Sequence, residues 1–445
     1  MFQIIRNAWK IADLRKKILF TVFILLIFRI GSAIPVPFVD MSALTTGMDS
    51  LDNQFVGYLT MMSGGGFSNA SLFALSITPY INASIIIQLL TVAIPYLERL
   101  SKDGEAGRKK LGQYTRYATV FLGLMLGIAY YFMVRNQFHA LTSAAMLPGF
   151  NSWFTAIVIV LCFTAGSSLM MWLGEQINEK GIGNGISMLL FAGILSRLPQ
   201  GVTFLWRMFW ESGIKGMIDS QQGAVWWMLK AILVVILFLL MIGFIVFMSD
   251  AERRIPVQYA KKVVGRKMYG GQSTHMPIKV NMSGVMPIIL AVSILSLPSI
   301  LTTFFGTPEK KFWANFVGAF AQDSWFYIFL YAIMIVGFAF FYVTIQYNPV
   351  EMANNLRKNG GAIPGQRPGK PTADFIKRVL NKVTFIGALF LGVVALFPSV
   401  FGKLSDITGL TIGGTSLMIV VGVALETVQQ MESQMMMRHY KGFLD

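Results

Sequence analysis

The feature that most constrains this chain is a series of apolar stretches, each about 20 residues long, separated by shorter polar segments. About 20 apolar residues are needed for one α-helix to cross the hydrocarbon core of a membrane. Backbone groups in lipid must pair internally, which allows only helices and closed barrels, and barrel strands show a much weaker alternating pattern. The sequence therefore predicts an all-α polytopic membrane protein.

The composition excludes a soluble globular protein. Of the 445 residues, 55% are hydrophobic and only 13% are charged, whereas an ordinary soluble protein carries about 25% charged residues. The mean hydropathy is +0.60. A soluble chain of this length would form about three domains, and this one has too few charged side chains to cover their surfaces.

Windows of about 19 residues predict ten membrane-spanning helices. The predicted spans cover residues 18–37, 72–97, 117–134, 153–173, 185–205, 226–248, 284–305, 324–346, 379–401 and 412–430. They form two pseudo-symmetric halves of five helices, at residues 1–205 and 226–430. An external connection at residues 206–225 joins the halves, and a cytoplasmic tail follows at residues 431–445. Paired halves are common in transport proteins, in which the substrate path follows the interface between the halves. The pattern predicts a conduit and does not identify its cargo.

Basic residues are unevenly divided between the two sides of the membrane. Lysine and arginine together number 37, against 21 aspartate and glutamate residues. The loops on the side of the N-terminus carry 27 of the basic residues, and the segments on the other side carry 8. Since cytoplasmic loops are enriched in Lys and Arg, we expect both termini to be cytoplasmic. The basic first 17 residues lead into a span-length apolar segment without a small-x-small cleavage site, which predicts a retained first span.

The residue types that catalysis or metal binding would need are scarce. The chain has one cysteine, Cys162, and three scattered histidines. A zinc site needs three or four ligands brought together, so we expect no metal, cofactor or internal disulfide. No His-Glu-x-x-His, P-loop or Gly-x-Ser-x-Gly motif is present. Arg29 and Glu426 lie near the ends of their spans and can snorkel to an interface. These observations argue against an enzyme.

A glycine-rich stretch precedes the second span. Gly64, Gly65 and Gly66 follow an apolar run that begins at Phe55. Each glycine destabilises a helix by about 1 kcal/mol relative to alanine, so residues of about 55–71 are not expected to form a full span. A short re-entrant helix inside a protein cavity is one solution, because irregular backbone at membrane depth must be shielded from lipid. An amphipathic loop on the external membrane surface is the other.

Two predicted cytoplasmic loops, 249–281 and 347–378, carry 13 of the 27 basic residues on the side of the N-terminus. The first combines seven basic residues with the strand-like segment Ile255–Tyr259. Residues 347–371 of the second contain four glycines and four prolines, which favours an extended, turn-rich finger. Such loops can dock an acidic or RNA-bearing partner. They can also act only on topology and on anionic lipids.

Six motifs in order across the chain resemble the SecY family, the central subunits of Sec protein-conducting channels. They are Phe28–Gly31 with Ile34–Pro37, Ser71–Leu90, Gly112–Tyr117, Trp172–Ile177 with Gly181–Ser187, Gln272–His275, and Ile363–Gly369. Together they extend over nearly the whole chain. Ser76 departs from the pattern, because the family usually has glycine there, and it leaves the local helix packing open.

The resemblance implies a central pore between the two five-helix halves. The implied pore ring is Ile77, Ile81, Ile186, Leu190, Ile289 and Ile419, with Leu190 in place of the commoner isoleucine. The implied plug is Gly64, Gly65, Gly66, Phe67, Ser68, Asn69 and Ala70. The second and seventh helices would form a lateral gate with Asn82, Gln88, Asn281 and Leu297 near the seam. The spacing of Ile77 and Ile81 places both on one helix face, although such pairs occur in every membrane helix.

The resemblance also implies a function and its partners. The chain would be the pore-forming subunit of a protein translocase in the cell membrane, passing unfolded secretory chains and releasing hydrophobic segments sideways into lipid. Implied partners are SecE-type and SecG-type subunits, the SecA motor ATPase, the ribosome, signal sequences and nascent chains. The motor and the ribosome would bind Arg253, Arg254, Lys261, Arg266, Arg357, Lys358 and Arg367. The alternative is a secondary transporter of a small solute, which would need a polar site at mid-membrane.

Overall fold

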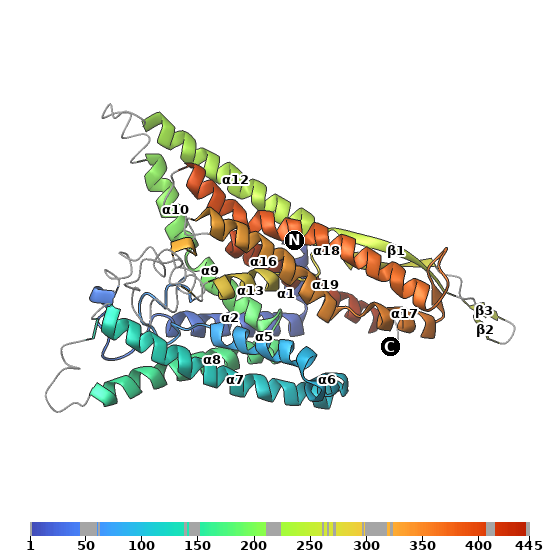
Figure 1. Ribbon diagram of the computed structural model, residues 1–445, viewed down its shortest axis with the longest axis horizontal. Helices are drawn as coiled ribbons and strands as arrows, with labels where there is room; N and C mark the ends of the chain where they lie inside the picture. The colour runs from blue at the N-terminus through green and yellow to red at the C-terminus, as the bar shows by residue number, and fades with distance from the viewer. Residues whose placement is uncertain are drawn as a thin grey trace. The chain divides into compact units, whose positions relative to one another are not determined.

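The computed structural model forms two compact units, which are described separately (Figure 1). It describes residues 2–44, 60, 63–137, 140–141, 152–210, 224–259, 262–264, 267–269, 273–295, 298, 318–320, 324–405 and 414–441. Unit 1 comprises Met1–Trp227, Pro298–Gly318 and Ile419–Asp445. Unit 2 comprises Met228–Leu297 and Ala319–Met418. The predicted division of the spans at residues 206–225 stays a prediction.

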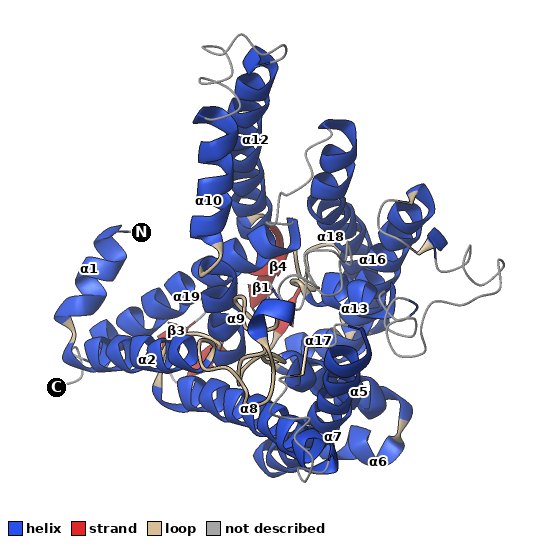
Figure 2. Ribbon diagram, turned by 90° about the vertical axis from the view of Figure 1, so that its left-hand side faces the viewer, coloured by secondary structure: helices blue, strands red, loops and turns tan. Residues whose placement is uncertain are grey.

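Unit 1 is built from packed helices. They are α1 (Phe2–Lys10), α2 (Ala12–Gly31), α5 (Thr78–Ala93), α6 (Pro95–Lys102), α7 (Gly104–Phe132) with the π-helical turn η1 (Met133–Gln137), α8 (Ser152–Lys180), α9 (Gly185–Leu195), α10 (Leu198–Arg207) and α19 (Gly414–Lys441) from Ile419 onward. Helix α8 packs against α2, α7 and α9, and α5 packs against α7 (Figure 2). A side chain at Gly185 would collide with the carbonyl of Gly174, so glycine is what allows α8 and α9 to approach closely.

Unit 2 combines helices with a small antiparallel sheet. Its elements are α12 (Ala224–Asp250) from Met228 onward, β1 (Glu252–Tyr259), β2 (Lys262–Val264), β3 (Lys267–Tyr269), β4 (Ser273–Lys279), α13 (Met286–Leu295), α16 (Trp325–Gln346), α17 (Pro349–Lys358), β5 (Gly361–Ala362) and α18 (Lys370–Ser405). Strand β1 lies between β4 and β5, with Ile255 opposite Met276, and β2 pairs with β3. The predicted strand-like segment Ile255–Tyr259 is confirmed in β1.

Each of the ten predicted spans contains a described helix. Among the described residues, six helices are long and apolar enough to cross a membrane, or seven if the bent pair α5 and α6 counts as one span. Helix α2 ends at Gly31, short of the predicted limit of 37, because Pro35 and Pro37 cannot continue a helix. The fifth predicted span is two helices, α9 and α10, separated by a turn at Ser196 and Arg197.

The second predicted span, 72–97, is helical only in its later part. Residues 72–77 follow successive turns, and α5 begins at Thr78 with a proline in its first turn. Ser76 has a φ of 51°, a left-handed conformation that a right-handed helix cannot contain. At the other end, Ile94 is extended before Pro95, and α6 leaves α5 at an angle of 104°. Proline and a left-handed residue therefore set both limits of α5.

Candidate functional site

The segment Ser63–Ser71, called the glycine segment below, is largely buried inside unit 1, with Asn69 exposed. Ser63, Ala70 and Ser71 have no exposed surface, and Phe67 is 3% exposed. This burial does not fit a loop lying on the membrane surface. The helix predicted for residues of about 55–71 is wrong for 63–70, which follow turns. Gly64 and Gly65 have φ values of 64° and 91°, outside the right-handed helical region. Residues 55–59, 61 and 62 lie outside the described residues.

Local hydrogen bonds shape the glycine segment. The amide of Gly65 donates to the Thr60 carbonyl at 2.8 Å. The Ser63 hydroxyl accepts from the amide of Phe67 at 2.8 Å and donates to the same Thr60 carbonyl at 3.2 Å. The amide of Ser71 donates to the Gly66 carbonyl at 2.9 Å. Short polar side chains and backbone groups thus satisfy each other where a helix ladder is absent, except that the buried Ser71 Oγ has no hydrogen-bond partner among the described residues.

The end of the glycine segment is fastened to the chain that follows α2. The amide of Val36 donates to the Ala70 carbonyl at 2.9 Å, and the amide of Leu72 donates to the Ile34 carbonyl at 2.9 Å. These two bonds form an antiparallel bridge between Pro35 and Ser71. Two of the motifs that carry the resemblance are therefore joined directly through their backbones.

An aromatic cluster holds the middle of the glycine segment. The rings of Phe67 and Tyr130 meet edge to face at 4.8 Å, and Tyr130 in turn lies 4.6 Å from the ring of Phe163. The Tyr130 hydroxyl donates to the carbonyl of Phe67 at 2.7 Å. Because Tyr130 belongs to α7 and Phe163 to α8, these contacts attach the segment to two packed helices.

The carbonyl of Gly64 receives two further donors from separate elements. Arg29, near the end of α2, donates from Nη1 at 3.1 Å, and Ser196, which follows α9, donates from Oγ at 3.3 Å. A Cβ atom added at Gly64 would lie only 2.7 Å from that Ser196 oxygen. Sequence reasoning treated Arg29 as a snorkelling residue and did not identify Ser196 or Tyr130.

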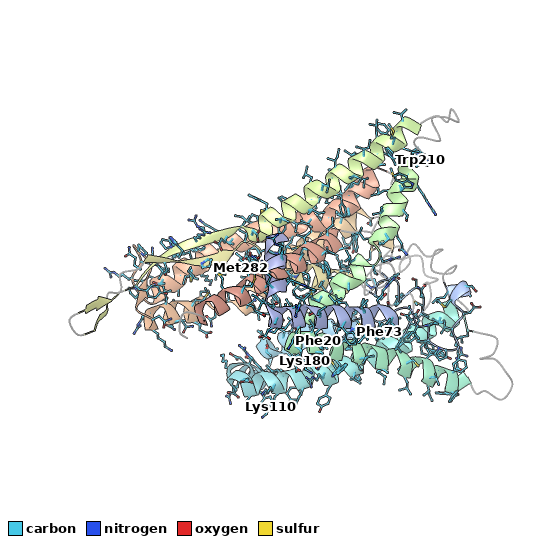
Figure 3. The ribbon with its side chains drawn as sticks, turned by 180° about the vertical axis from the view of Figure 1, so that it is seen from behind. Phe20, Phe73, Lys110, Lys180, Trp210 and Met282 are labelled. Carbon is cyan, nitrogen blue, oxygen red and sulfur yellow. The ribbon has the colours of Figure 1, made fainter. Side chains whose placement is uncertain are left out.

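Residues 72–77 lead from the glycine segment into α5 and pack on α2 and α8. Phe73 stacks on Phe28 of α2, with ring centroids 6.2 Å apart (Figure 3 labels Phe73). Gly31 has no room for a side chain because the Phe73 ring occupies that space. A side chain at Gly166 of α8 would likewise collide with the Leu72 carbonyl. The start of α5 is thus fixed by contacts on both sides.

The segment that follows Pro37 also has a fixed conformation. The amide and hydroxyl of Ser42 donate to Oδ1 of Asp40 at 3.0 and 2.6 Å. These hydrogen bonds, the one from the hydroxyl being the stronger, lower the pKa of the Asp40 carboxyl below its ordinary value. The Asp40 amide donates to the Ala140 carbonyl at 2.8 Å, which ties the segment to the chain after η1.

The predicted ring residues are divided between the two units. Ile77 directly precedes α5 and Ile81 lies in its first turn, whereas Ile186 and Leu190 lie on α9, Ile419 on α19 and Ile289 on α13. All are buried except Ile186, which is partly buried. The amide of Ile81 donates to the Ile77 carbonyl at 3.0 Å, so this pair spans one helical turn as predicted. The six-residue ring stays a prediction, since Ile289 belongs to unit 2 and the other five belong to unit 1.

The predicted gate residues also lie in both units. Asn82 and Gln88 are partly buried on α5. Asn281 lies between β4 and α13, and its buried Oδ1 has no hydrogen-bond partner among the described residues. Leu297 lies outside the described residues. The lateral gate stays a prediction.

The first predicted docking loop exposes its arginines on a strand. Arg253 and Arg254 lie on β1, and Nε of Arg254 is 2.6 Å from a carboxylate oxygen of Glu252. Both arginine side chains are exposed, and strand alternation places Arg254 on the face opposite the buried Ile255 and Val257. Two further predicted docking residues, Lys261 and Arg266, lie outside the described residues.

The second predicted docking loop is partly helical, which corrects the prediction of an extended finger over 347–371. Asn348 caps α17 by accepting from the amide of Val350 at 3.1 Å, Pro349 occupies the first turn, and Arg357 and Lys358 end the helix. Helix start and stop signals therefore outweigh the glycines and prolines nearby. Only residues 359–369 form turns, apart from β5. In them the Arg367 carbonyl accepts from the Thr372 hydroxyl at 2.8 Å.

Comparison of the sequence with known proteins gives consistent matches. The profile of the SecY family matches residues 71–428. The protein translocase subunit SecY of Streptomyces coelicolor is 44% identical, and the alignment covers 98% of each chain. The corresponding subunit of Halalkalibacterium halodurans is 42% identical, with 100% of each chain covered.

Solved structures give the same result for the fold. A protein-conducting channel matches with a TM-score of 0.62 at 18% identity, covering 94% of this chain and 92% of that one. A SecY structure whose plug domain stabilises the closed state and maintains a membrane seal matches with a TM-score of 0.58 at 16% identity, with the same coverage. The fold class predicted from the sequence, a multi-pass helical membrane protein, is therefore confirmed. With its family profile and full-length relatives in agreement, this chain belongs to the SecY family.

Proposed function

We propose that this chain is the pore-forming subunit of a protein translocase, a channel subunit and not an enzyme. It passes unfolded secretory chains across the membrane and releases hydrophobic segments sideways into lipid. The observation that carries this proposal is full-length identity of 42–44% with translocase subunits. The relatives do not support the alternative, a secondary transporter of a small solute. In liposomes containing the purified translocase, a secretory chain should be taken up with its motor present, and small solutes should not.

The pore ring is proposed to be Ile77, Ile81, Ile186, Leu190, Ile289 and Ile419. Aliphatic side chains form a constriction that excludes ions by dewetting. They recognise no particular sequence, so they can part around any extended chain. The burial of five of these residues supports the proposal.

The plug is proposed to be Gly64–Ala70. Its burial beside the start of α5, which carries Ile77 and Ile81, supports this assignment. Arg29, Tyr130 and Ser196 each donate one hydrogen bond to the segment, and Tyr130 adds a ring contact with Phe67. Single hydrogen bonds contribute about 0.5–1.5 kcal/mol each. A translocating chain can therefore displace the segment without unfolding the helices around it.

The lateral gate is proposed at Asn82, Gln88, Asn281 and Leu297. Polar contacts between helices in lipid contribute roughly 0.6–2 kcal/mol each. A hydrophobic signal sequence gains about 0.8 kcal/mol for each CH₂ group that it buries. Its insertion can therefore outweigh several polar contacts at the seam. The buried Asn281 Oδ1, which has no hydrogen-bond partner in the described part of the chain, supports a polar role for that residue.

The ribosome is the partner with most support. Solved relatives of the fold include the canine Sec61 channel in a ribosome complex and an idle yeast Ssh1 complex on a ribosome. SecE-type and SecG-type subunits, the SecA motor, signal sequences, nascent chains and anionic lipids complete the proposed set. We place the chain in the cell membrane with both termini cytoplasmic, which the charge distribution supports.

A charge at the ring tests the channel directly. Ile81→Lys or Ile289→Lys should raise the resting ion conductance in planar bilayers several-fold, because a hydrated charge removes the dewetted barrier. Ile81→Leu serves as the matched control and should have the same resting conductance as the parent. If the resting conductance of both lysine variants equals that of the parent, the ring assignment is wrong. Secretory-chain uptake tests the translocase function separately.

A further inference from the structure

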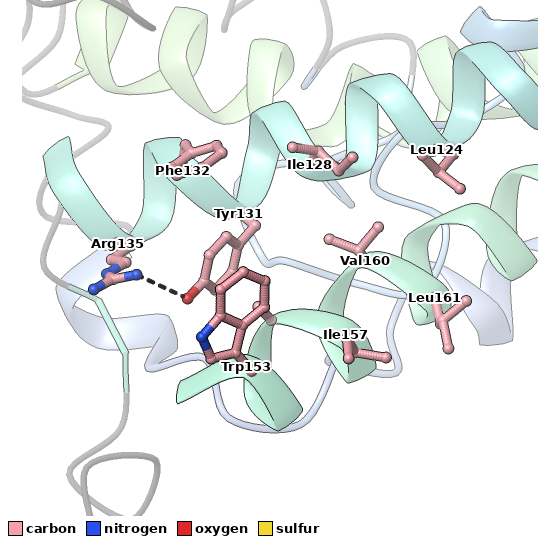
Figure 4. A pocket seen from close by; sticks show the side chains of 10 residues that line it. Leu124, Ile128, Tyr131, Phe132, Arg135, Trp153, Ile157, Val160 and Leu161 are labelled. Carbon is pink, nitrogen blue, oxygen red and sulfur yellow. Dashed lines mark hydrogen bonds between the residues drawn. The ribbon is translucent and has the colours of Figure 1, made fainter. Parts of the chain in front are cut away.

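A groove lies between α7 and α8 at the end where η1 follows α7. Its volume is about 640 Å³, within the roughly 300–1,000 Å³ of pockets that hold small ligands. Both walls come from unit 1. The lining residues are Leu124, Ile128, Tyr131, Phe132, Arg135, Trp153, Ala156, Ile157, Val160 and Leu161 (Figure 4). Most of them are aliphatic or aromatic and exposed, so the groove opens to the apolar surroundings of the helices.

The groove has one polar end. Arg135 and Trp153 lie at that end, and Leu124 and Leu161 lie at the other (Figure 4). Arg135 is the one charged residue among the ten that line the groove. Its Nη1 is 3.5 Å from Oη of Tyr131, a neutral partner. No carboxylate among the described residues pairs with it.

Helical spacing places Arg135 at the groove, because it follows Tyr131 by four residues and Ile128 by seven on the same face. In η1 the side chains of Met133 and Val134 pack into the core of unit 1, whereas Arg135 is exposed. Trp153, 75% exposed at the start of α8, lies nearby. Arginine and tryptophan at the end of a membrane helix are the residues that meet lipid headgroups. The groove therefore runs from the headgroup level into the apolar core.

We propose that this groove binds one anionic phospholipid, with an acyl chain between α7 and α8 and the phosphate against the Arg135 guanidinium. Charge complementarity supports this occupant, because the phosphate supplies the anion that the described residues lack and can accept two guanidinium donors. A zwitterionic lipid such as phosphatidylcholine also carries a phosphate, but its ammonium group offsets the charge, so Arg135 attracts an anionic lipid more strongly.

Photocrosslinking in a defined bilayer tests the proposal. The purified full-length chain is placed in nanodiscs of phosphatidylcholine that contain a small fraction of phosphatidylglycerol with a photoreactive group on one acyl chain. We expect crosslinks concentrated on the groove residues of α7 and α8. Unlabelled phosphatidylglycerol should compete for the site, and further phosphatidylcholine should not. Crosslinks spread evenly over all lipid-facing helices would overturn the proposal.

Two variants and a matched control sharpen the result. Arg135→Gln should reduce groove crosslinking about fivefold, the equivalent of roughly 1 kcal/mol for one cation near an anionic lipid. Ile157→Trp fills the groove and should reduce crosslinking with the charge retained. Arg207→Gln, which removes an exposed arginine at the end of α10, should change nothing. Unchanged crosslinking in both groove variants, or crosslinking of the groove to a partner polypeptide in native membranes, contradicts the proposal.

Discussion

At the scale of single residues, Tyr130 holds the glycine segment through both its ring and its hydroxyl. Tyr130→Phe keeps the ring contacts and removes the donor to the buried carbonyl of Phe67. The Phe67 carbonyl would keep only the longer bond from the Ala70 amide, at 3.3 Å. The loss of one hydrogen bond costs about 0.5–1.5 kcal/mol, so the closed plug should be weakened about two- to tenfold. We expect a higher resting conductance in planar bilayers, with secretory-chain uptake retained.

Tyr117 provides the control for that substitution. It lies on the same helix and is 72% exposed, so Tyr117→Phe should leave conductance unchanged. If Tyr130→Phe and Tyr117→Phe have the same resting conductance, the Tyr130 hydroxyl does not hold the plug closed.

Gly64 tests whether close packing, as well as hydrogen bonding, keeps the plug in place. Gly64→Ala forces a left-handed alanine, at about 1–2 kcal/mol, and brings its Cβ against Ser196. Gly65→Ala carries the same kind of strain but meets nothing within 4 Å. We therefore expect a larger rise in conductance for Gly64→Ala, measured in the same bilayers. Equal conductances would mean that the contact with Ser196 has no role.

Sequence reasoning located the glycine segment but not the residues that hold it. The run of three glycines is a local signal, so its irregular backbone could be predicted. Tyr130, Phe163 and Ser196 reach it from 60 or more positions away. Nothing in the types or spacing of these residues separates them from other aromatic and hydroxyl side chains of membrane helices. Arg29 alone carried a signal, because a charge inside a span calls for a partner.

At the scale of elements, hydrophobic length predicted the helices well and their ends poorly. Long uniform spans such as 226–248 and 324–346 match α12 and α16 within a few residues. The limits of α5 depend instead on Ser76 and Pro95, and hydropathy averages over both. The prediction of an extended finger over residues 347–371 is wrong at α17 for a related reason. Asn348 and Pro349 form a helix start, although a high content of proline and glycine in a segment favours turns.

The loop that carries Arg367 makes a prediction about docking. Gly365 and Gly369 have φ values of 80° and 106°, and the Thr372 hydroxyl caps the Arg367 carbonyl, so the turn has a defined shape. If a motor or ribosome contacts this turn, Arg367→Glu should sharply reduce motor-driven export without affecting membrane insertion. Arg367→Lys should be partly active, because it keeps the charge and loses the planar donors.

The contrast between these two variants separates docking from topology. A charge needed only for topology would be replaced fully by lysine, and one loss among 27 basic residues would pass unnoticed. Export should be measured in vesicles with equal channel content. Export by Arg367→Glu close to the parental rate would move the docking site to the 249–281 loop.

At the scale of the whole molecule, cysteine crosslinking can test the lateral gate. Disulfides require Cα atoms within about 7 Å. With Cys162 replaced, cysteines at Asn82 and Leu297 should form a bridge under oxidation and block export until they are reduced. A pair at Asn82 and Leu239, an exposed residue of α12, is the control and should not crosslink. Absence of a bridge at Leu297 and at the neighbouring positions would exclude the second and seventh helices as the gate.

The length of α18 has a mechanical consequence. Its segment Lys370–Pro398 has 29 residues, about 44 Å at 1.5 Å per residue, whereas the hydrocarbon core is about 30 Å thick. At the N-terminal end Ile376 and Leu380 pack with Ile255 and Ile363, so the excess of about 14 Å lies on the side of the sheet. Farther along, Leu391 is buried within the unit. Helix α18 therefore joins the Arg367 turn to buried residues of unit 2 through one continuous helix, and we expect a displacement of that turn to be transmitted along it.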